Sequence, residues 1–80
     1  MVYKAKYRRD SSSVLVTASE EFSSHETAES FLKEKLASLG VTNIQNVSHL
    51  SPSKNHSWFG SVSKEYPDVP DLVGVIQAIG

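Results

Sequence analysis

Eighty residues are enough for one domain with a small core, which we place over residues 1–80. A formal charge of −1, with 21% charged and 39% hydrophobic residues, is ordinary for a globular domain and unlike one whose main task is to bind polyanions. There is no cysteine, which excludes disulfides and thiolate metal sites, and no apolar run long enough for a bilayer, so we expect a cytoplasmic protein without a membrane span.

Two strand patterns open the chain. Residues 2–9 alternate between apolar and basic side chains, as a half-buried strand does. Residues 14–18 resume apolar alternation after a polar turn, so we predict an antiparallel hairpin. The basic positions of the first strand are Lys4, Lys6 and Arg8, followed directly by Arg9.

The segment from Ser23 to Val41 is a helix with a signal at each end. Ser23 and Glu26 fit a capping box at its start, and Gly40 followed by Val41 fits a Schellman closure at its end. A short helix with one apolar face needs a sheet to cover. The apolar positions are Ala28, Phe31, Leu32, Leu36 and Leu39.

The second half of the chain is less regular. Residues 41–50 predict a third strand with a bulge, residues 51–56 a loop, and Trp58–Ser63 a fourth strand in which Gly60 marks a bulge or a close backbone approach. Residues 68–80 fit a helix or a strand, and we favour the helix. The predicted fold is therefore two-layer α+β: a four-stranded, mainly antiparallel sheet in the order β-β-α-β-β, one helix on one face, and a C-terminal helix or strand.

Motifs for catalysis, cofactors or metals are missing from the sequence. The glycines are scattered, no Gly-x-Ser-x-Gly elbow occurs, and the three histidines, His25, His49 and His56, lack the spacing of metal ligands. We therefore predict no enzyme, no cofactor and no metal. A concave site that brings a histidine and an acid together would favour an enzyme instead.

Trp58-Phe59 is the dipeptide that most favours binding of a partner. Successive strand residues point to opposite faces, so if one ring enters the core the other faces outward or is covered by another segment. We predict a small non-enzymatic accessory or inhibitory protein that binds another protein, a class that includes factors carried by phages and other mobile elements. The candidate partner-binding residues are Trp58, Phe59, His56 and Lys54.

The basic first strand supports an alternative function. If one sheet face is open, Lys4, Lys6, Arg8 and Arg9 beside an exposed Phe59 would form a platform for single-stranded nucleic acid. Alternating lysines are also the usual solvent face of a two-layer domain. An exposed sheet edge is a further candidate binding surface, because it can pair with a strand of a partner or with a second copy of the chain.

Overall fold

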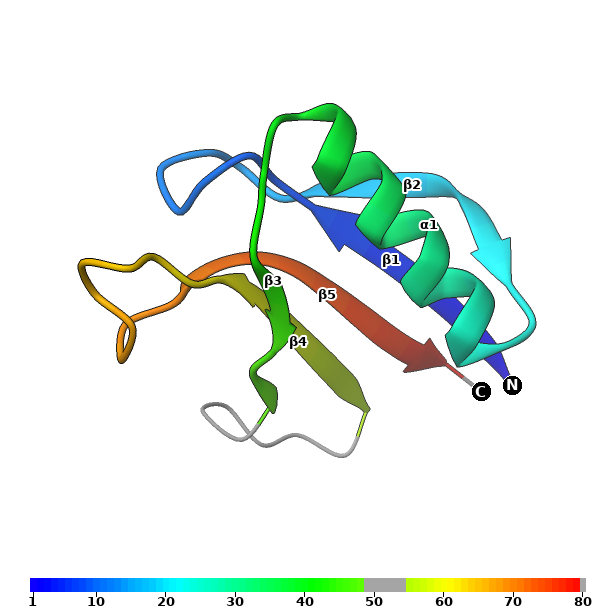
Figure 1. Cartoon of the computed structure of the whole chain (residues 1–80). Coiled ribbons are helices and arrows are strands. Elements are labelled where there is room, and N and C mark those ends of the chain that lie inside the picture. The colour runs from blue at the N-terminus through cyan, green and yellow to red at the C-terminus, as the bar shows by residue number, and fades with distance from the viewer. Residues whose placement is uncertain (49–54, 80) are drawn as a thin grey trace.

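The computed structural model describes residues 1–48 and 55–79. One helix lies across one face of a five-stranded sheet, in which every neighbouring pair of strands is antiparallel (Figure 1). The elements in chain order are β1 (Val2–Tyr7), β2 (Val16–Phe22), α1 (His25–Ser38), β3 (Ile44–Asn46), β4 (His56–Ser61) and β5 (Asp71–Ile79). The sheet order is β2-β1-β5-β4-β3. The α+β class, the antiparallel sheet and the β1–β2 hairpin are thus confirmed, and the predicted number of four strands is wrong.

The fifth strand is the C-terminal segment, for which we favoured a helix. β5 is the central strand, paired with β1 on one side and β4 on the other. Residues 73–76 are all buried, because both faces of this central strand are covered. A strand in such an environment is apolar throughout. Gly74 belongs in this strand because a Cβ atom there would come within 2.9 Å of the Leu32 side chain of α1.

Both ends of α1 are closed by local hydrogen bonds. The N-cap is Ser24, one residue later than predicted, and its Oγ accepts from the backbone N–H of Thr27 at 3.2 Å. At the other end the predicted Schellman closure is confirmed. Gly40 has a φ of +83°, and the backbone N–H of Val41 donates to the carbonyl of Leu36 at 2.9 Å.

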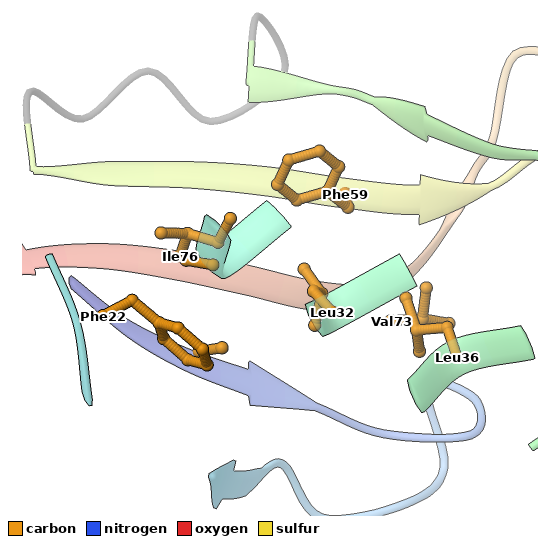
Figure 2. Close-up of a cluster of buried hydrophobic side chains, with 8 residues drawn as sticks. Phe22, Leu32, Leu36, Phe59, Val73 and Ile76 are labelled. Carbon is orange, nitrogen blue, oxygen red and sulfur yellow. The ribbon is translucent and has the colours of Figure 1, made fainter. Parts of the chain in front are cut away.

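The core lies between α1 and the sheet (Figure 2). The helix contributes three of its five predicted apolar residues as fully buried side chains, while Phe31 is partly buried and Leu39 is exposed. The sheet supplies the opposite wall. The buried side chains of this cluster are Ala5, Phe22, Ala28, Leu32, Leu36, Phe59, Val73 and Ile76.

The third and fourth strands differ from the predicted bounds. β3 is only three residues long, and β4 begins at His56, which we had placed in a loop. The register of β4 with β5 shifts between Phe59 and Gly60, next to the glycine for which a bulge was expected. The rest of the predicted 51–56 loop falls largely outside the described residues, as does His49. None of the helices in the described part of the chain has the length and apolar character needed to cross a membrane.

Candidate functional site

The sheet face opposite α1 carries no α-helix in residues 1–48 and 55–79 (Figure 1). We call this surface the open face. Its side chains lie in two rows that cross the strands in register. One row is Glu21, Lys4, Gln77 and His56, and the other is Thr17, Lys6, Val75 and Trp58.

Alternation along each strand assigns these residues to the open face. Ala5, Ile76 and Phe59 are in the core beneath α1, so the residues next to them in β1, β5 and β4 point the other way. Val75 supports the assignment: it is only 2% exposed, yet it does not belong to the core cluster under α1. Its neighbours in register are Lys6 and Trp58, which flank it on the same face.

Two lysines form the positive part of the open face. Lys4 and Lys6 stand two residues apart on β1, which corresponds to about 7 Å along the strand. In the part of the chain that the structure describes, neither ammonium group lies within salt-bridge distance of a carboxylate. Glu21 is the acidic member of the two rows, at the outer strand and opposite Lys4. The centre of the face is therefore positive although the chain as a whole carries −1.

Trp58 and His56 form the aromatic part. Their ring centroids are 6.3 Å apart and the ring planes differ by 18°, so the rings are stacked along β4. Two hydrogen bonds to the residues that follow β3 hold the backbone of Trp58: its N–H donates to Ser48 Oγ at 3.0 Å, and its carbonyl accepts from the N–H of Val47 at 2.8 Å. The indole is partly exposed on a backbone that is fixed by hydrogen bonds.

The other predicted binding residues do not join this surface. Phe59 is 1% exposed in the core and is removed as a candidate, because the strand turns Trp58 outward and Phe59 inward. Arg8 follows the end of β1, and its Nε donates to the backbone carbonyl of Leu72 at 2.6 Å. Arg9 is exposed in a hollow at the C-terminal end of α1. Lys54 lies outside the described residues.

His25, in the first turn of α1, meets the test that we set for an enzyme only in part. Its Nε2 is 3.0 Å from Ser57 Oγ, its Nδ1 is 3.9 Å from Glu29 Oε1, and its ring packs at 87° to that of Tyr3 with the centroids 5.9 Å apart. These are the residue types of an acyl-transfer triad. The distance from His25 to Glu29 is too long for a hydrogen bond, and the Glu29 carboxylate also accepts from Lys33 at 3.1 Å. We interpret the contact as a link between α1 and β4.

The sheet edges are poor templates for strand addition. On β2, three residues lie opposite Ala5, because Lys4 pairs with Glu21 and Lys6 with Thr17. Such an irregularity bends an edge strand and interrupts its row of free backbone groups. The opposite edge is the three-residue β3. Oligomerisation through an edge stays a prediction, and these features disfavour it.

Sequence reasoning missed Val75 and Gln77, because it favoured a helix for the segment that holds them. A strand assignment would have placed both on one face at a spacing of two. No group of three or more acidic, histidine or cysteine side chains suited to a metal ion occurs in the described residues. No protein-family model, curated protein or solved structure matches this chain. We therefore infer function from the open face itself.

Proposed function

We propose that this chain is a small binding protein that captures a macromolecular partner on its open face and serves as an accessory or inhibitory factor. The observation that supports this function is the position of Trp58. A large aromatic side chain is partly exposed on a sheet face that no described α-helix covers, and it stands in register with Val75 and Lys6. Tryptophan is among the residues that most often dominate binding energy at interfaces.

The shape and chemistry of the face favour a large partner over a small molecule. A sheet surface is broad and lacks the concave walls that bury most of a small ligand. Its centre combines the partly exposed Trp58 with the polar ends of Lys4, Lys6 and Gln77. Proteins and single-stranded nucleic acids both bind to surfaces of this composition. The sequence alone favours the protein partner.

An affinity capture with matched variants tests the binding surface. The wild-type chain, Trp58→Ala and Glu34→Gln are immobilised and exposed to a lysate of the native host, with and without nuclease treatment. Glu34 is an exposed residue of α1, on the other side of the sheet, and serves as the control. We expect the wild type and Glu34→Gln to recover the same partner, as protein or as nucleic acid, and Trp58→Ala to lose most of it.

Circular dichroism must show that Trp58→Ala is folded before its loss of capture is attributed to the surface. If the folded Trp58→Ala protein recovers the same partner in the same amount as the wild type, the open face is not the binding surface and the proposal is wrong. The same holds if Glu34→Gln loses the partner as completely as Trp58→Ala does.

A further inference from the structure

We propose that the ligand of the open face is a single-stranded nucleic acid, an inference that rests on the proposed function and names its partner class. Lys4 and Lys6 are about 50 residues away from His56 and Trp58 in the sequence. The register of β1, β5 and β4 brings Lys4, Lys6, His56 and Trp58 to one surface. Positive charge and stacking rings on one sheet face are the two features that such a ligand requires.

The lysines provide contacts for phosphates. Lys4 and Lys6 project from the same face at about 7 Å spacing along β1, so two ammonium groups follow one direction across the surface. The acidic residues Glu26, Glu29 and Glu34 are on α1, which packs on the opposite face of the sheet. The sheet and the core separate these carboxylates from the lysines. The open face can therefore be positive although the whole chain carries a net charge of −1.

Trp58 provides a stacking surface for a base at a suitable distance from the lysines. Lys6, Val75 and Trp58 occupy three adjacent strands in register, which places Lys6 and Trp58 about 10 Å apart across the sheet. The phosphate and the base lie at opposite ends of a nucleotide, so a phosphate at Lys6 and a base at Trp58 can belong to the same stretch of strand. His56, stacked along β4, extends the aromatic surface toward the other row.

Gln77 provides a hydrogen-bonding group between the two features. It lies in register between Lys4 and His56, is partly exposed, and makes no side-chain hydrogen bond within the described residues. An amide side chain can donate to and accept from the edge of a base. Such edges are fully accessible only in an unpaired strand.

The sheet character of the face favours a single strand over a duplex. Direct readout of a B-form duplex needs a helix or a two-stranded ribbon in the major groove, and the open face is a sheet surface with Trp58 set within it. A base can reach that ring only when it is unstacked from its neighbours. A protein partner is less favoured, because the apolar centre at Val75 is already 98% covered, and the ammonium groups of Lys4 and Lys6 beside it form no ion pair with a carboxylate among residues 1–48 and 55–79.

Fluorescence anisotropy of dye-labelled oligonucleotides about a dozen nucleotides long tests the inference. Single-stranded DNA, single-stranded RNA and a DNA duplex of the same sequence are titrated with the protein over a range of salt. We expect the single strands to bind more tightly than the duplex. The logarithm of the association constant should fall with the logarithm of salt concentration with a slope of about −1.4, as two phosphate contacts imply.

Matched variants then separate the two parts of the site. Lys4→Gln/Lys6→Gln should bring the salt slope close to zero, whereas Lys33→Gln/Lys35→Gln, with the same change of net charge on α1, should leave it unchanged. Trp58→Ala should weaken binding roughly 5- to 150-fold, the range for loss of one stacked base. Trp58→Phe keeps an aromatic ring and should retain most of the affinity.

Several results would overturn the inference. These are the absence of binding to single strands at low salt, an equal loss of slope in both double variants, and a duplex that binds as tightly as a single strand. If oligonucleotides do not bind but a protein is captured from nuclease-treated lysate in a Trp58-dependent way, the partner is a protein. In that case the proposed function stands and the inference fails. If Trp58→Ala changes neither measurement, both are wrong.

Discussion

Truncation of the adjacent residues Trp58 and Phe59 should have opposite consequences for folding and binding. Phe59 is 1% exposed and packs in the core with Leu32 and Ile76 (Figure 2). Replacement of a buried phenylalanine by alanine typically costs about 3–5 kcal/mol, because it removes apolar contacts and leaves a cavity. An 80-residue domain has a free energy of unfolding of about 4–12 kcal/mol in total. Phe59→Ala should therefore be largely unfolded or close to it.

Trp58→Ala should be milder because Trp58 is partly exposed to solvent. The substitution removes part of a hydrophobic contact but leaves no closed cavity, so we expect a loss of about 1–2 kcal/mol. Urea unfolding followed by far-ultraviolet circular dichroism measures both variants, since Trp58 is the single tryptophan and its fluorescence disappears in one of them. Phe59→Leu keeps most of the apolar volume and should restore much of the stability lost in Phe59→Ala.

The comparison tests which ring faces the core. If Trp58→Ala destabilises the chain as much as Phe59→Ala does, both rings are structural and Trp58 is not available to a partner. If Phe59→Ala has its unfolding midpoint at the same urea concentration as the wild type, the assignment of the two faces of β4 is wrong. The expected pattern is a folded Trp58→Ala that has lost its partner and a Phe59→Ala that has lost its fold.

Two further substitutions test local packing and capping, each through the free energy of unfolding. Gly74→Ala should cost about 1–3 kcal/mol, because the new Cβ would lie 2.9 Å from Leu32 Cδ2; in the background of Leu32→Ala the additional cost should be smaller, and equal costs would show that the contact is not the cause. Ser24→Ala should cost about 1 kcal/mol and Ser23→Ala much less, since Ser24 is the N-cap. The reverse order would return the cap to Ser23, where the capping-box pattern placed it.

The helix could be predicted well because its signals are local. The position of Gly40 before Val41 specifies a closure that few other residue types allow, and it is present as predicted. The predicted start of the helix was one residue too early, because the adjacent Ser23 and Ser24 carry the same capping hydroxyl. The capping-box pattern with Glu26 favoured Ser23, whereas the bond from the N–H of Thr27 to Ser24 Oγ makes Ser24 the N-cap.

The central strand could not be predicted with the same success because its environment is not local. Residues 72–76 are apolar on both faces, since α1 covers one face and side chains of the open face cover the other. A continuous apolar run does not distinguish a buried strand from a helix. Gly74 was the available signal: glycine is unfavourable inside a helix, and in the sheet it makes room for Leu32.

The candidate site was predicted in separate pieces. Alternation correctly placed Lys4 and Lys6 on one face and required Trp58 and Phe59 to point apart, but it did not show which ring faces the helix. That outcome depends on the register of β4 against β5, which pairs Trp58 with Val75. The register of two strands is set by contacts between segments distant in the sequence, so it could not be predicted from the sequence alone.

The burial of Val75 helps to explain how a sheet face that carries no α-helix in the described part of the chain stays stable, and it also yields a test. Lys6 stands beside Val75 in register, and the aliphatic part of a lysine side chain can cover an apolar neighbour while its ammonium group reaches solvent. Lys4 stands beside the polar Gln77 instead. Lys6→Ala should therefore lower the free energy of unfolding by about 1 kcal/mol, the value of one to two buried methylene groups, and Lys4→Ala should lower it less. Lys6→Met keeps the stem without the charge and should restore stability while still weakening phosphate binding. Equal losses for Lys6→Ala and Lys4→Ala in urea unfolding would show that Lys6 does not cover Val75.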